Sequence, residues 1–176
     1  ITVSPAATTT FTVTGTDANG CTDTETITIT VNALPTVTTS TLDNVLCFGE
    51  NTDITANGAV SYVWVPGNLA GATQTVSPAG TTTFTVTGTD ANGCTDTETI
   101  LITVNANPVV SAGAVPIVIC AGQSSTLTAS GAVNYVWQPG ALAGSSVVVT
   151  PAATTTFTVT GTDANGCTST AGRTVT

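Results

Sequence analysis

The sequence predicts an all-β chain of tandem immunoglobulin-like β-sandwich repeats with a 73-residue period, and three observations support this prediction. The stretch FTVTGTDANGC occurs three times without change, beginning at Phe11, Phe84 and Phe157. Thr alternates with Val, Ile or Phe along the chain, a period of two that is typical of strands burying one face. No stretch has the period of an amphipathic helix.

The 73-residue register divides the chain into one partial repeat and two further repeats. We expect the C-terminal part of an Ig-like repeat over residues 1–33, an Ig-like repeat over 34–106 and another over 107–176. Pro35 and Pro108 mark the joints between them. Because these linkers are only a few residues long, neighbouring repeats are expected to touch end to end.

The second repeat shows the expected order of elements. Its first strand is split at residues 41–43, and Phe48-Gly-Glu-Asn forms the following turn. Asn92-Gly93 supplies the positive φ that a tight hairpin requires. Short strands, turns every 8–12 residues and one central Trp are typical of an immunoglobulin-like sandwich. The expected strands cover residues 35–40 with 44–47, 52–56, 61–65, 73–77, 82–89 and 94–105, and the loop 66–71 is expected to hold at most a vestigial strand.

The alternating pattern also identifies the core. Residues two apart on a strand share a face, so the mid-strand Trp and the Phe-x-Val pairs are expected to be buried. A sugar-stacking platform is the alternative role for the Trp and Tyr side chains. Arg173 replaces Ile100 of the preceding repeat, and we expect it to point outward or to make the last strand less regular. The predicted core comprises Ile54, Tyr62, Trp64, Phe84, Val86, Leu127, Tyr135, Trp137, Phe157 and Val159.

Composition excludes several classes of function. The chain has a single cationic residue, ten acidic residues and a net charge of −9, which argues against binding to nucleic acid or to an anionic membrane. No apolar run is long enough for a membrane span. There is no His, and acidic residues form no recurring pair, since Glu50 corresponds to Gln123. We therefore expect no enzymatic activity.

The three Asp-Ala-Asn-Gly turns are the candidate metal-binding sites, and Asp23, Glu25, Asp96 and Glu98 could assist them. Calcium prefers six or more oxygen ligands, and one Asp with one Asn per turn falls short of that number. We expect plain hairpin turns and no cofactor, with calcium as the weaker alternative. The calcium candidates are Asp17, Asn19, Asp90, Asn92, Asp163 and Asn165.

Two cysteines per repeat without His indicate disulfides rather than zinc. In this fold Cys120 lies at the bottom turn of its repeat and Cys167 beside the top turn. The six strand residues from Phe157 to Asp163 rise about 20 Å, whereas a disulfide requires Cα atoms within about 7 Å. The bottom of one repeat meets the top of the next, so an inter-repeat Cys47–Cys167 bond ranks first. Intra-repeat Cys47–Cys94 and Cys120–Cys167 bonds are the alternative.

The Trp strand, the segment Val76–Thr87 and the segment Thr89–Thr97 resemble the PKD-like and immunoglobulin-like repeats of Bacteroidota cell-surface proteins. That resemblance implies an extracellular adhesin or filament exported by the type IX system, similar to gliding-motility adhesins. Near-identity of adjacent repeats favours a structural segment of a long cell-surface stalk, fibre or filament with an adhesive role. A spacer or carbohydrate-binding module of a secreted polysaccharide-degrading enzyme is the alternative.

The partners that we expect follow from this interpretation. They are the neighbouring repeats of the same chain, other copies in laterally assembled fibres, and glycans or surfaces. The Thr-rich composition, about a quarter of all residues, is common on secreted and glycosylated stalks. The Thr-Thr-Thr runs are therefore either O-glycan acceptors or solvated strand entries.

Overall fold

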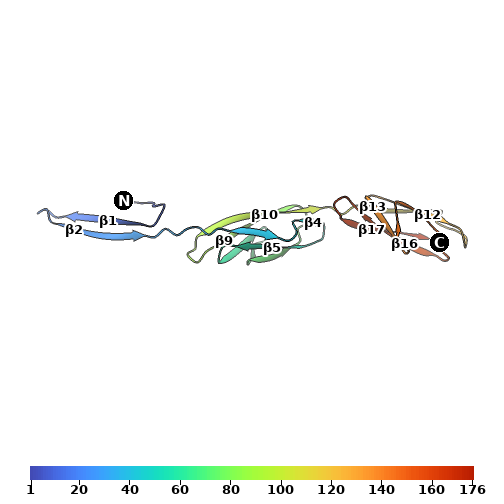
Figure 1. Ribbon diagram of the computed structural model, residues 1–176, viewed down its shortest axis with the longest axis horizontal. Helices are drawn as coiled ribbons and strands as arrows, with labels where there is room; N and C mark the ends of the chain where they lie inside the picture. The colour runs from blue at the N-terminus through green and yellow to red at the C-terminus, as the bar shows by residue number, and fades with distance from the viewer. The chain divides into compact units, whose positions relative to one another are not determined.

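The computed structural model describes residues 1–176 and consists of strands, turns and loops without a helix. The alternation of β-branched and polar residues accounts for this, because Thr, Val and Ile favour the pleated conformation. Figure 1 labels many of the strands, which are numbered in chain order. No helix is present that could cross a bilayer.

The partial first repeat is a single hairpin. Its strands pair antiparallel in unbroken register, from Thr9 opposite Ile29 to Thr16 opposite Thr22. The Asp-Ala-Asn-Gly turn joins them. The two strands are β1 (Thr9–Thr16) and β2 (Thr22–Ile29).

The second repeat forms two sheets, with strand orders β3-β5-β8 and β4-β10-β9-β6-β7. The split first strand contributes β3 to one sheet and β4 to the other, and β4 runs parallel to β10. This exchange between sheets is typical of an immunoglobulin-like sandwich. The strands are β3 (Thr38–Thr41), β4 (Val45–Cys47), β5 (Thr52–Asn57), β6 (Ser61–Val65), β7 (Leu69–Ala70), β8 (Thr73–Val76), β9 (Thr82–Thr89) and β10 (Thr95–Asn105).

The third repeat also forms two sheets, β11-β12-β15 and β14-β13-β16-β17. Its strands follow those of the second repeat at the 73-residue spacing, except that residues 118–120, which correspond to β4, form no strand. The chain is thus an all-β array of immunoglobulin-like sandwiches. The strands are β11 (Ser111–Val115), β12 (Ser125–Ser130), β13 (Asn134–Gln138), β14 (Leu142–Ala143), β15 (Ser146–Val149), β16 (Thr155–Thr162) and β17 (Thr168–Val175).

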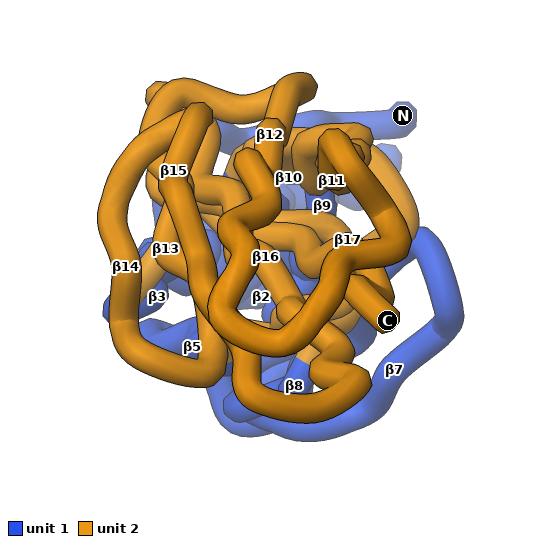
Figure 2. The backbone as a smooth tube through the Cα atoms, turned by 90° about the vertical axis from the view of Figure 1, so that its right-hand side faces the viewer, with its two compact units in different colours: residues 1–42, 53–75, 83–100 blue, residues 43–52, 76–82, 101–176 orange.

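Two compact units are distinguished by colour in Figure 2. Unit 1 comprises residues 1–42, 53–75 and 83–100, and unit 2 comprises residues 43–52, 76–82 and 101–176. Unit 2 therefore contains the third repeat together with the end of the second repeat that carries Cys47. The division at residues 33/34 and 106/107 stays a prediction.

Each sandwich buries one indole at its centre. Trp64 and Trp137 have no exposed surface, and each Nε1 donates a hydrogen bond of 3.1 Å to a backbone carbonyl, that of Gly71 or Gly144. The Tyr two residues earlier is also buried. The other predicted core residues are buried as well, namely Ile54, Phe84, Val86, Leu127, Phe157 and Val159.

Of the two alternatives expected for Arg173, a less regular last strand or an outward-pointing side chain, the first is wrong. β17 pairs with β16 without interruption, and Arg173 lies opposite Phe157. The Arg173 side chain is half-buried, and its Nε is enclosed without a hydrogen-bond partner. β16 and β17 are paired through eight consecutive residue pairs. Because so many backbone pairs stabilise this register, one unfavourable side chain does not disrupt it.

Candidate functional site: the joint between repeats

The loop that carries Cys47 follows directly from strand β4. The Cys47 N–H donates to Glu50 Oε2 at 2.8 Å, and the Glu50 N–H donates back to the Cys47 carbonyl at 3.0 Å. Gly49 allows this tight loop because its φ of 95° is one that side chains disfavour. Ser77 Oγ donates to the Glu50 carbonyl at 2.8 Å and so ties the loop to the segment after β8. The sulfur atom of Cys47 is therefore held by a fixed loop.

The turn that carries Cys167 is organised by an aspartate. Asp163 Oδ1 accepts hydrogen bonds from the N–H groups of Asn165, at 2.8 Å, and Cys167, at 2.9 Å. The Asp163 N–H in turn donates to the Cys167 carbonyl at 2.9 Å. A carboxylate that accepts two backbone donors holds a turn firmly, because charge-assisted hydrogen bonds are stronger than neutral ones.

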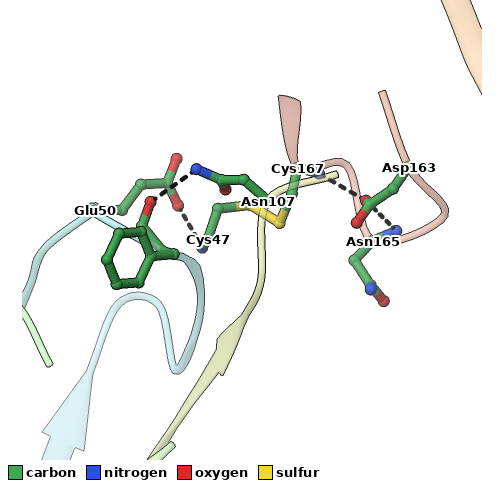
Figure 3. The surroundings of a disulfide bond; sticks show 7 residues. Cys47, Glu50, Asn107, Asp163, Asn165 and Cys167 are labelled. Carbon is green, nitrogen blue, oxygen red and sulfur yellow. Dashed lines mark hydrogen bonds between the residues drawn. A yellow bond between two sulfur atoms is a disulfide. The ribbon is translucent and has the colours of Figure 1, made fainter. Parts of the chain in front are cut away.

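A disulfide joins Cys47 to Cys167, with Cα atoms 5.5 Å apart (Figure 3). This is the inter-repeat pair that the geometric reasoning ranks first. Cys94 and Cys120 carry free thiols, so neither intra-repeat bond, Cys47–Cys94 or Cys120–Cys167, is formed. The bottom loop of the second repeat is thus bonded to the top turn of the third.

Hydrogen bonds to Phe48 reinforce the joint. The Phe48 N–H donates to the Asn105 carbonyl at 2.8 Å, and Asn107 Nδ2 donates to the Phe48 carbonyl at 3.1 Å. Asn107 belongs to the linker itself. Figure 3 shows the disulfide and the Asn107 side chain beside the loop that carries Cys47 and Glu50. Cys167 is only 1% exposed, whereas Cys21 at the same position of the first repeat is exposed.

The calcium candidates lie in three turns of the same construction. Asp17, Asp90 and Asp163 each accept two backbone N–H groups through Oδ1. The asparagine of each turn donates a hydrogen bond to that carboxylate through its backbone N–H and not through its side chain. These asparagines are Asn19, Asn92 and Asn165. No cluster of three or more metal-ligating side chains is present. This geometry favours the role of a hairpin turn.

The aromatic residues do not form a sugar-stacking platform. Tyr62 is 8% exposed, and its hydroxyl accepts from the Ala59 N–H at 2.7 Å and donates to the Ala59 carbonyl at 2.8 Å. Tyr135 makes the same pair of bonds with Ala132. Each hydroxyl thus donates one hydrogen bond and accepts one within the fold.

Asn107 and Gly161 were not identified as joint residues by the sequence. Leu34 stands where the next joint has Asn107, so repetition gave no signal for it. An isolated glycine inside a strand does signal close approach. A Cβ on Gly161 would lie 2.6 Å from Val110 Cγ2 and 2.8 Å from Ala132 Cβ. Gly161 thus leaves room for the residue at the end of the linker.

No protein-family model and no curated protein matches the chain. Among solved structures, it is similar to murine CEACAM1b, with a TM-score of 0.38 and 11% identity over 80% of this chain and 98% of that one. It is also similar to a Ca²⁺-stabilised adhesin with which an Antarctic bacterium binds ice, with a TM-score of 0.43 and 18% identity over 96% of this chain. This chain spans 56% of that adhesin's length. A 1.5-MDa bacterial ice-binding adhesin gives a TM-score of 0.37 and 16% identity, over 94% of this chain and 72% of that one.

Proposed function

We propose that this chain is a structural segment of a long extracellular repeat protein that carries tension in a cell-surface stalk or filament with an adhesive role. The observation that supports this proposal is the Cys47–Cys167 disulfide, which bridges two repeats with a sequence separation of 120 residues. A disulfide inside one repeat would stabilise only that repeat. A disulfide between two repeats keeps them joined even when one of them unfolds.

The disulfide changes the route that a pulling force takes. Force applied at the two ends of the chain enters the closed loop at Cys47 and leaves it at Cys167 through the sulfur–sulfur bond. Residues 48–166 are then bypassed, including strands β5 to β16. These strands cannot be drawn out by tension while the bond is intact, although they can still unfold thermally within the loop.

Single-molecule stretching tests this proposal, with handles at residues 1 and 176. At about 3.6 Å per extended residue, we expect the oxidised chain to reach a contour length of about 200 Å. The double variant Cys47→Ser with Cys167→Ser should reach about 630 Å. Cys94→Ser is the matched control and should behave as the parent protein. Extension of the oxidised chain beyond about 400 Å would show that the disulfide does not carry the force.

We further propose an extracellular, bacterial cell-surface location. Disulfides persist in oxidising compartments, and the resemblance to Bacteroidota surface repeats suggests export by the type IX route. Protease treatment of intact cells, followed by non-reducing peptide mapping, checks this location. Protection of the repeats from external protease, with free thiols at Cys47 and Cys167, would contradict it.

A carbohydrate-binding role in a secreted enzyme receives no support from the aromatic side chains, since Trp64 and Trp137 are enclosed. A spacer role remains the alternative to a stalk. The stretching experiment does not separate these two roles. The number of repeats in the full-length protein does, because a spacer requires only one or two.

A further inference from the structure

The charges of this chain are distributed unevenly among the repeats. Nine of the ten acidic residues lie within residues 1–106, whereas residues 107–176 carry only Asp163 and the single cation, Arg173. The third repeat is therefore neutral, although the chain has a net charge of −9. Two copies of the chain repel each other through their first and second repeats. The third repeat is the part that a second copy can approach with the least repulsion.

The third repeat also has an open sheet edge. Strand β15 is the last strand of the sheet β11-β12-β15 and has a neighbouring strand on one side only. The Ala129 N–H donates to the Ser145 carbonyl at 2.8 Å, and the direction of the backbone groups alternates along an antiparallel strand. Ser146 and Val148 therefore direct their N–H and carbonyl groups away from β12. Such an edge is a template for pairing with a strand of another chain.

Exposed valines line the outer face of this sheet. Val148 lies opposite Thr126, which in turn lies opposite Val115, so the three residues form one row across the sheet. Val148 is 65% exposed and Val115 is 74% exposed. Pairs of β-branched side chains stabilise neighbouring strands. The open edge is thus apolar and well suited to a further strand.

This row belongs to the side of the sandwich and not to a joint. The corresponding residues of the second repeat, which a further repeat follows, are Leu42, Asp53 and Thr75. All three are exposed. A following repeat therefore leaves this row open.

A carboxylate occupies the same position beside the edge of the second repeat. Asp53 stands where the third repeat has Thr126, and Thr75 stands where it has Val148. Thr75 Oγ1 donates to Asp53 Oδ1 at 2.5 Å, which places a negative charge next to the edge strand β8. Two such edges would repel each other, because like charges on paired strands are destabilising.

A second polar side chain ties down the edge strand of the second repeat. Gln74 Nε2 donates to the Ala70 carbonyl at 2.8 Å and so connects β8 to β7 of the other sheet. The third repeat has Val147 in place of Gln74. Charged residues and covered edges are the means by which proteins keep edge strands from pairing. The third repeat has valines at both positions instead.

We propose that β15 of one copy of this chain pairs antiparallel with β15 of a second copy, so that two third repeats associate side by side. A contact between identical surfaces has two-fold symmetry. Pairing Val148 with Val148 of the second copy also brings Val147 opposite Val149, so these pairs each join two valines. The proposal rests on the proposed function and deepens it, because it names a second copy as the lateral partner of the stalk or filament.

The contact is expected to be weak and to depend on salt. Strand β15 has only four residues, and stable interfaces bury about 1,600 Å² in total. The dimer should therefore form only as the protein concentration is raised. Because each copy carries a net charge of −9, association should strengthen at higher ionic strength, where repulsion is screened.

Crosslinking at the two-fold axis tests the geometry. The parent protein has Ser in place of the three free cysteines, Cys21, Cys94 and Cys120, and keeps the Cys47–Cys167 bond. Val148→Cys in this parent, oxidised with glutathione, should form a disulfide-linked dimer at least about tenfold faster than Thr75→Cys, because association raises the effective concentration of the thiols. Thr75→Cys is the matched control, since it places an exposed thiol at the same position of the second repeat. Equal rates would overturn the proposal.

Sedimentation equilibrium of the parent without an added cysteine tests association itself. Val148→Asp should weaken the dimer at least about tenfold, because it places two like charges opposite each other. Thr75→Asp adds the same charge to the second repeat and should leave the dimer unchanged.

The triple variant Asp53→Thr, Gln74→Val and Thr75→Val gives the second repeat the edge of the third and should strengthen association. A parent that stays monomeric at every concentration, or equal effects of Val148→Asp and Thr75→Asp, would overturn the proposal. Neither result affects the proposed tension-bearing function, which the stretching of single chains tests through Cys47 and Cys167.

Discussion

The Tyr135 hydroxyl group holds the backbone of the loop at Ala132. Tyr135 is 8% exposed, and its hydroxyl satisfies both the N–H and the carbonyl of Ala132. Tyr135→Phe leaves these two backbone groups without a partner, so we expect a loss of about 1–3 kcal/mol in the free energy of unfolding. Urea unfolding measures this loss. Val136→Ala on the exposed face of the same strand should cost less, and equal costs would contradict the assigned role.

Aspartate at the start of the turn is expected to assist joint formation. Asp163→Ala removes the acceptor of two backbone hydrogen bonds. We expect the Cys47–Cys167 bond to form several-fold more slowly from reduced protein, because the turn no longer holds Cys167 in place. Thiol trapping over time measures this rate. Asp17→Ala changes the same residue in an unbonded turn and should leave the rate unchanged.

Among the strands, the glycine of the TGT segment has different surroundings in the three repeats. A Cβ on Gly88 would lie 2.5 Å from Val37 Cγ2, and one on Gly161 would lie 2.6 Å from Val110 Cγ2, whereas Gly15 has no neighbour within 4 Å. We expect Gly88→Ala and Gly161→Ala each to destabilise by about 1–3 kcal/mol, as overpacking does. Gly15→Ala should be neutral in the same urea titration. Equal effects at all three positions would contradict the packing explanation.

Sequence pattern predicts these elements well because the period of two is continuous. The structure places strands at Ser61–Val65 and Thr82–Thr89, the ranges that alternation indicates. Arg173 shows the limit of such reasoning, since eight paired residues outweigh one unfavourable side chain. Asn107 could not have been identified, because its hydrogen bond to Phe48 depends on where the linker meets the loop. Comparison of the repeats identifies the residues that all repeats share, but it does not identify a residue that occurs at only one joint.

At the scale of the whole molecule, one disulfide restrains two repeats. Cys47 adjoins Phe48, whose N–H is bonded to the Asn105 carbonyl at 2.8 Å. When the third repeat unfolds alone, the disulfide therefore closes a loop from about Asn105 to Cys167. A loop of about 60 residues corresponds to about 4 kcal/mol of lost chain entropy in the unfolded state. When the second repeat unfolds alone, the disulfide likewise closes a loop of similar length, which runs from Cys47 to about Asn107.

Removing the disulfide should therefore weaken both repeats and leave the hairpin unaffected. In Cys47→Ser with Cys167→Ser, we expect the slowest amides of β9–β10 and β16–β17 to exchange up to about a thousandfold faster, since each 1.4 kcal/mol is a factor of ten. The β1–β2 hairpin lies outside the closed loop, so its exchange should not change. Acceleration confined to the third repeat would mean that the bond stabilises the turn at Cys167 alone. Equal acceleration in the second and third repeats follows only if the joint is the shared restraint on both.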